Sequence, residues 1–87
     1  MKTWTDKRLH KREAIRIAAT AVMDDGFIRE DVLVVNLSRS GAMVEIAESI
    51  ELPEAFTLLF HHSLEPCHVV WRQARYAGVK FDAILAE

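Results

Sequence analysis

The chain has 87 residues, of which 51% are hydrophobic and 28% charged, with a formal net charge of −2. These values fit one globular domain and exclude a disordered chain, and no apolar run approaches the roughly 20 residues that span a bilayer. The N-terminus lacks the apolar segment of a signal peptide, and the single cysteine, Cys67, excludes an internal disulfide. We therefore expect a cytoplasmic protein that does not insert into a membrane.

The charge is divided unevenly along the chain. Residues 1–16 hold six basic and two acidic side chains, for a net charge of +4, whereas the other 71 residues have a net charge of −6. Extended nucleic acid favours positive charge spread over a whole face. A short basic segment on an acidic body instead favours a small anionic ligand.

The N-terminal part predicts an arm followed by a strand. Residues 1–14 are mainly polar and lack a convincing amphipathic period, which predicts a flexible basic arm. From Ile15 to Met23 every second residue is apolar, the period of a half-buried strand. This alternation outweighs the helical tendency of residues 13–23, and Asp24-Asp25-Gly26 then predicts a hairpin turn.

The remainder of the chain reads as five more short strands separated by turns. The predicted strands cover residues 27–35, 42–46, 56–60, 67–73 and 78–82, with connections at 36–41, 47–55 and 61–66. Six strands at this spacing predict an all-β fold, a six-stranded antiparallel β-barrel, whose closure removes exposed edges. The predicted organisation is one domain, with the arm at 1–14 and the barrel at 15–87.

Two short polar motifs indicate a binding site. Arg8 and Arg12 lie four residues apart on the arm, and each arginine offers a planar fork that fits a guanine edge or two phosphate oxygens. Asn36, Ser38 and Gly41 lie between two predicted strands. Asn36 can pair with a purine edge, Ser38 can donate to phosphate, and Gly41 permits a positive φ or a close approach. We expect the turn to be a rigid floor and the arm a mobile clasp.

In this order and strand pattern, the two motifs resemble the PilZ domain family, bacterial receptor modules for cyclic di-GMP. The family's RxxxR and (D/N)xSxxG signatures are complete here as Arg8, Arg12, Asn36, Ser38 and Gly41. Residues 67–72 and 78–81 are similar to the family's last two strands, so the resemblance covers nearly the whole chain. It implies a six-stranded barrel that binds cyclic di-GMP through those five residues.

The chain also departs from the family pattern. It stops soon after the last predicted strand, so we expect little or no C-terminal helix. Lys11 stands where a proline is often seen, which predicts a looser arm. If the nucleotide binds as two intercalated copies, further arginines are needed, and Arg39 and Arg72 are the auxiliary candidates.

Metal binding and catalysis are not expected. His61, His62, Cys67 and His68 are zinc-ligand types, but adjacent residues of a strand point to opposite faces. No nucleophile elbow, phosphate-binding glycine loop or pair of catalytic carboxylates is visible. We therefore expect no enzyme activity and no cofactor besides the nucleotide ligand. Trp71 and Phe81 are expected to pack inside the barrel, and Trp4 against its wall.

The expected function is a cyclic di-GMP-switched adaptor, in which arm closure changes the surface shown to an unidentified effector protein. One alternative is a PilZ-like interaction module that binds no nucleotide. Another is a barrel for single-stranded nucleic acid, which requires aromatic residues alternating with basic ones on a strand face, a pattern absent here. The resemblance implies control of motility, exopolysaccharide production or biofilm formation, without choosing among them.

Overall fold

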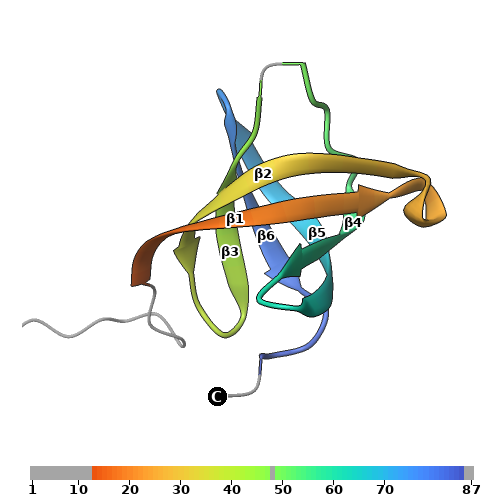
Figure 1. Cartoon of the computed structure of the whole chain (residues 1–87). Helices are drawn as coiled ribbons and strands as arrows, with labels where there is room; N and C mark the ends of the chain where they lie inside the picture. Colours follow the sequence, from red (N-terminus) through yellow and green to blue (C-terminus); the bar gives the residue numbers. More distant parts are fainter. Residues whose placement is uncertain (1–12, 48, 86–87) are drawn as a thin grey trace, which may run out of the picture.

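The computed structural model describes residues 13–47 and 49–85. Six antiparallel strands close into a barrel in the order β1-β2-β3-β6-β5-β4 (Figure 1). The strands are β1 (Glu13–Met23), β2 (Ile28–Leu37), β3 (Gly41–Glu45), β4 (Ala55–Phe60), β5 (Ser63–Gln73) and β6 (Tyr76–Phe81). The predicted all-β barrel is therefore confirmed. Within the described ranges the one helical element is the 3-10 turn η1 (Asp24–Gly26), and no helix has the length and apolarity to cross a membrane.

The predicted arm falls mainly outside this description. Residues 1–12, including Trp4, are not among the described residues. β1 begins at Glu13, two residues before the predicted Ile15.

Alternation of apolar residues puts one face of each strand inside the barrel. Phe56, Leu58 and Phe60 of β4 are all buried, as their spacing predicts. Phe81 is buried too, and its ring stacks on that of Phe60 with centroids 6.1 Å apart. Leu52 joins this core from the 46–54 connection, although it lies in no strand. The core is thus formed by strand residues together with one loop residue.

β5 is longer than predicted and contains a proline. A connection was predicted over residues 61–66, but only His61-His62 forms the turn. Pro66 pairs with Thr57 of β4, and its carbonyl accepts a hydrogen bond from the Asp82 amide at 2.9 Å. In an antiparallel strand the N–H and C=O of one residue point to the same side. The missing N–H of Pro66 therefore faces the end of β6 and removes no bond between β4 and β5.

β2 contains a bulge that turns Asn36 outward. Val34 is buried and pairs with β3, and the next pair joins Asn36 to Met43, which leaves Val35 without a partner on β3. An extra residue in one strand places the residue after it on the opposite face. Asn36, which simple alternation would direct into the core, instead lies on the outer wall. It belongs to β2 and not to the turn in which the sequence placed it, because β2 runs to Leu37.

A second bulge does the same for Trp71 in β5. Val69 packs against the core, the next pair joins Trp71 to Gly78, and Val70 is left over. Trp71 is therefore on the outer wall and is not part of the core cluster. The prediction that Trp71 packs inside was wrong because it extended the alternation through a bulge that the sequence does not reveal.

Replacing Leu58 with alanine tests the core assignment. Leu58 is fully buried, so Leu58→Ala should lower the free energy of unfolding by about 2–5 kcal/mol through lost burial and the cavity left behind. Urea unfolding followed by circular dichroism measures this loss. Leu64→Ala on β5 is the control, because Leu64 is 62% exposed and should change stability by no more than about 0.5 kcal/mol. Equal losses in the two variants would show that the core is placed wrongly.

Candidate functional site

The hydroxyl of Ser38 organises the turn between β2 and β3. The amides of Ser40 and Gly41 donate to Ser38 Oγ at 3.3 and 3.2 Å, and the Ser38 amide donates to the Gly41 carbonyl at 2.9 Å. The hydroxyl proton remains for donation, and within the turn its nearest acceptors are Ser40 Oγ at 3.2 Å and the Gly41 carbonyl at 3.4 Å. An anionic oxygen is a stronger acceptor than either. Ser38 thus both fixes the turn and can donate to a phosphate.

Gly41 is required by a close approach between β3 and β6. A Cβ at this position would meet the backbone carbonyl oxygen of Val79, with the Lys80 Cα 3.4 Å away. The φ of Gly41 is not positive, so of the two reasons considered for a glycine here, only the close approach applies. The Phe81 amide also donates to the Ser40 carbonyl at 2.8 Å. The turn is therefore tied to β6 as well as to its own strands, which makes it a rigid floor.

Asn36 carries an unsatisfied acceptor on this floor. Its Oδ1 atom is buried and has no hydrogen-bond partner among the described residues. A buried polar atom without a partner costs about 1–3 kcal/mol. An N–H donor from a bound molecule, such as the ring N–H of guanine or a guanidinium, would remove that cost. This atom makes the outer wall beside the turn a candidate binding position.

The strand register places Trp71 in the same outer row as Asn36. Asn36 pairs with Met43, Met43 with Gly78, and Gly78 with Trp71, across β2, β3, β6 and β5. A Cβ at Gly78 would overlap the Trp71 indole ring, which shows that the ring lies across the glycine. The absent side chain at position 78 thus lets an aromatic face lie against the wall. Trp71, Met43 and Gly78 were not among the predicted site residues, because only the cross-strand register reveals this row.

The arm joins the barrel beside the turn. Glu13, the first residue of β1, pairs with Leu37, the last residue of β2. Arg12 is bonded directly to Glu13. Arg8 stands five residues before Glu13, so it stays within about 18 Å of that residue. Both arginines lie outside the described residues, but chain connectivity keeps them within reach of Ser38.

The two auxiliary arginines occupy different places. Arg39, in the turn, exchanges hydrogen bonds with the C-terminal segment: its Nε donates to the Leu85 carbonyl at 3.2 Å, and the Leu85 amide donates to the Arg39 carbonyl at 2.7 Å. Arg72 follows Trp71 on β5 and lies four residues beyond His68, the β5 residue level with Gly41. Four strand residues span roughly 13 Å. The structure therefore brings Arg39 to the turn but not Arg72.

The histidines and the cysteine do not converge. His61-His62 forms an exposed turn with φ values of 50° and 62°. Cys67 is buried in the core, while the next residue, His68, lies on the exposed side with its Nδ1 3.3 Å from Asp82 Oδ1. Among residues 13–47 and 49–85, no group of three or more His, Cys, Asp or Glu side chains is placed to hold a metal ion.

Comparison with known proteins identifies the family. The family model for the PilZ domain matches residues 6–87. Since this match spans almost all of the chain, the protein belongs to the PilZ domain family.

A solved structure shows the same fold. The barrel is similar to the crystal structure of the PilZ domain of CeSA from a cellulose-synthesizing bacterium. The TM-score is 0.61 and the sequence identity 16%, over 82% of this chain and 79% of that one. At this identity the similarity concerns the fold alone. No match was found among curated proteins.

Burial controls the chemistry of Cys67. The pKa of the thiol is raised from 9.0 to about 12, chiefly because burial removes it from water and also because the negative charges of Asp82 and Glu65 disfavour the thiolate. Since the thiolate is the reactive form of cysteine, the folded protein holds this residue as an inert core thiol at neutral pH.

This raised pKa predicts a loss of stability in alkali. The unfolded thiol ionises near pH 9 and the folded one near pH 12, so between these values unfolding releases a proton and becomes more favourable as the pH rises. The contribution amounts to about 1.4 kcal/mol per pH unit. Urea unfolding of the wild type and Cys67→Ala between pH 8 and about 11 isolates it, because the other alkaline groups are common to both. Parallel pH profiles for the two proteins would contradict the buried, neutral thiol.

Proposed function

We propose that this PilZ domain is a receptor for cyclic di-GMP that exposes a changed surface to a partner protein when its arm closes over the nucleotide. The observation that carries the proposal is the orphan acceptor of Asn36 beside the Ser38 turn, at the point where the arm enters the barrel. PilZ domains are a cyclic di-GMP receptor family, and all five residues of the family's two motifs are present in this chain.

The floor supplies one set of contacts. Asn36 Oδ1 accepts from the donor edge of a guanine, and the Ser38 hydroxyl donates to a phosphate oxygen. The Ser38 hydroxyl does not have to move far, since the bonds around Ser38 and the close approach at Gly41 already hold the turn, whereas the buried Oδ1 of Asn36 has to become accessible as the ligand binds. Such preorganisation reduces the ordering cost of binding.

The outer wall supplies a stacking surface. The Trp71 indole lies across Gly78 with part of its surface accessible, in the row that begins at Asn36. An aromatic ring stacks on a nucleic-acid base with about 1–3 kcal/mol of binding free energy. Met43, between the two ends of the row, adds an adaptable apolar contact.

The arm contributes two arginines that contact the nucleotide, and it changes conformation when the nucleotide binds. Arg8 and Arg12 each offer a bidentate contact to guanine or phosphate. Ordering the arm costs about 1–2 kcal/mol per residue in backbone entropy, which offsets much of the gain from those contacts. A net affinity in the micromolar range, about −8 kcal/mol, is therefore expected. The ligand shifts the arm toward its closed population, and the closed arm is what a partner recognises.

Isothermal titration calorimetry of the full chain with cyclic di-GMP tests the proposal. Saturable binding is expected for the wild type. Arg12→Ala should weaken it by about 1–3 kcal/mol, roughly fivefold to 150-fold, because one bidentate contact is lost. Lys2→Ala is the matched control, since it removes the same charge from the arm outside the RxxxR motif and should leave the affinity close to that of the wild type.

Two results would contradict this function. If the folded wild type produces no binding heat, the domain is an interaction module that binds no nucleotide. If Arg12→Ala and Lys2→Ala weaken binding equally, the arm contributes only general charge and the clasp is wrong. Circular dichroism of each variant establishes that the barrel is intact.

A separate titration tests the stacking surface. Trp71→Ala should weaken cyclic di-GMP binding by about 1–3 kcal/mol, whereas Trp71→Phe keeps an aromatic face and should recover most of the affinity. Val70→Ala is the neighbouring control, because Val70 is exposed and lies in the bulge outside the row. Wild-type affinity in Trp71→Ala would remove the tryptophan from the site.

A further inference from the structure

The hairpin formed by β1 and β2 leaves one strand edge open. β2 pairs with β1 from Ile28 to Leu37, but it pairs with β3 only from Leu33 onward, where Leu33 meets Glu45. The segment 28–32 therefore has a second edge that no strand covers. Among the described residues, no backbone hydrogen bond from the 46–54 connection reaches this edge. In Figure 1 the same end of the hairpin projects beyond the other strands. An uncovered edge is a template for pairing with another strand.

The sequence of this edge is complementary to itself. Residues 28–32 read Ile-Arg-Glu-Asp-Val. When two copies of this segment pair in antiparallel fashion about a centre at Glu30, Arg29 of each copy stands opposite Asp31 of the other. The symmetric pair therefore contains two such contacts. Ile28 likewise stands opposite Val32. Arg29 and Asp31 are both exposed, and neither forms an ion pair in the described part of the chain. Opposite charges at directly opposed positions stabilise strand pairing.

The same register brings an exposed aromatic residue to a groove. Phe27, at the hairpin end, is 86% exposed. With Ile28 of one copy opposite Val32 of the other, Phe27 reaches the level of Leu33, where β3 ends. A groove of about 300 Å³ opens there, lined by the apolar residues Val32, Leu33, Ile46 and Ala47 and by the charged residues Arg16, Asp31, Glu45 and Arg75.

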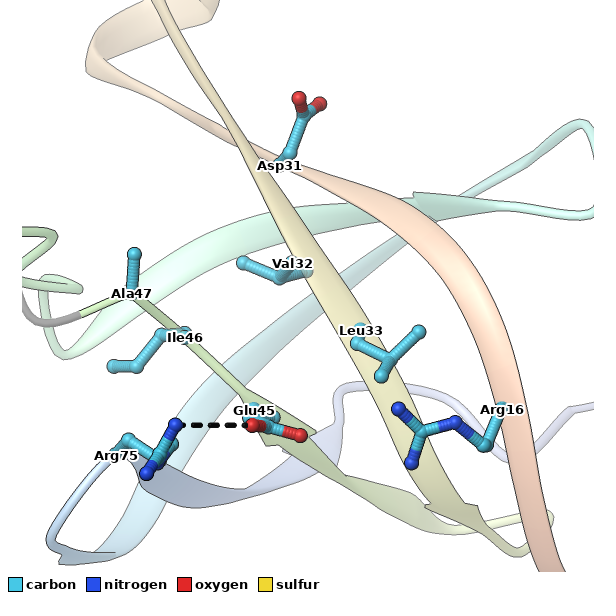
Figure 2. Close-up of a pocket in the computed structure, with 8 residues that line it drawn as sticks. All are labelled: Arg16, Asp31, Val32, Leu33, Glu45, Ile46, Ala47 and Arg75. Carbon is cyan, nitrogen blue, oxygen red and sulfur yellow. Dashed lines mark ion pairs between the residues drawn. The ribbon is translucent and has the colours of Figure 1, made fainter.

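Charged side chains also line the groove. Figure 2 shows Arg16 and Arg75 on opposite sides of Glu45, and Arg75 Nη1 lies 3.6 Å from a Glu45 carboxylate oxygen. Leu33 and Ile46 are partly exposed and Ala47 is exposed, so these three residues offer the apolar surface for an aromatic ring. In this register the exposed Phe27 of one copy lies level with the groove of the other copy, so its ring can contact the apolar side chains there.

We propose that the domain associates with a second copy of itself by antiparallel pairing of the two β2 edges over residues 28–32, with Phe27 of each copy seated in the groove of the other. The pairing is two-fold symmetric, so each surface meets its own counterpart. Glu30 lies on the axis opposite Glu30 of the second copy, and this like-charge contact weakens the dimer. One short strand pair and two phenylalanines form a small interface, which places the dimer among weak, reversible associations. The inference does not depend on nucleotide binding.

A charge exchange tests the register. Sedimentation velocity of the nucleotide-free full chain, from micromolar to millimolar concentration, should show reversible dimers for the wild type. Arg29→Asp or Asp31→Arg alone puts like charges opposite each other twice, and each should raise the dissociation constant about tenfold or more. The double variant Arg29→Asp/Asp31→Arg restores opposite charges and should recover the wild-type dissociation constant.

Three further variants complete the design. Phe27→Ser should weaken the dimer and Glu30→Gln should tighten it, because the first empties the groove and the second removes the repulsion on the axis. Glu54→Arg is the charge-matched control for Asp31→Arg: Glu54 is exposed just before β4, and its carbonyl bonds to β5, so the dimer should be unchanged. A wild type that stays monomeric at millimolar concentration would overturn the proposal. The proposal would also be overturned if the dissociation constant of Arg29→Asp/Asp31→Arg were no lower than those of the two single variants.

Discussion

In a closed barrel of this size, every strand residue lies on the inside or the outside by strict alternation, and the core depends on that alternation. The apolar positions of β1 and β4 keep to it without interruption, which is why Ala21 and Leu58 meet in the interior. The site depends on two interruptions. One extra residue in β2 and one in β5, at Val35 and Val70, reverse the face on which the next residue lies. The barrel thus keeps its inner face apolar while its outer wall gains a polar and an aromatic group.

The two glycines in this wall act through the space they leave. At Gly41 a side chain would collide with the β6 backbone, and at Gly78 it would collide with the Trp71 ring. One glycine brings the turn against β6, and the other lets an indole lie across the sheet. Both effects produce a floor whose shape is set before a ligand arrives. In the proposed binding mode the ordering cost then falls on the arm, so the entropy lost on binding is concentrated in one segment.

The β1–β2 hairpin separates two surfaces. At one end Glu13 and Leu37 bring the arm to the Ser38 turn. At the other end the hairpin extends past the last residue of β3 that pairs with it. Its open edge begins just beyond the groove between Leu33 and Ala47. The proposed nucleotide site and the proposed contact with a second copy of the chain therefore use different ends of one hairpin. Because β1 and β2 pair from Glu13 and Leu37 to Met23 and Ile28, with one shift of register between Ala14 and Ile17, the hairpin is also the physical connection between the two ends.

The fold class could be predicted from the sequence, because a period of two in apolar residues survives in any barrel that buries those residues. It also predicted the Asp24-Asp25-Gly26 turn and the inward row of Phe56, Leu58 and Phe60. The strand ends were less predictable: Pro66 suggested a loop, yet it fits β5 because its missing N–H faces the end of β6. The ligand-binding roles of Arg8, Arg12, Asn36, Ser38 and Gly41 came from a motif resemblance and stay predictions.

The face that Asn36 and Trp71 occupy became visible only in the folded barrel, as did the row that they share with Met43 and Gly78. A bulge is a property of the register between two strands and leaves no mark in the alternation of either strand alone. The same is true of the close approach at Gly41 and of the free edge at residues 28–32, since each depends on where a neighbouring strand lies or ends. Local pattern determines what a strand buries, and the pairing of strands determines what the barrel presents.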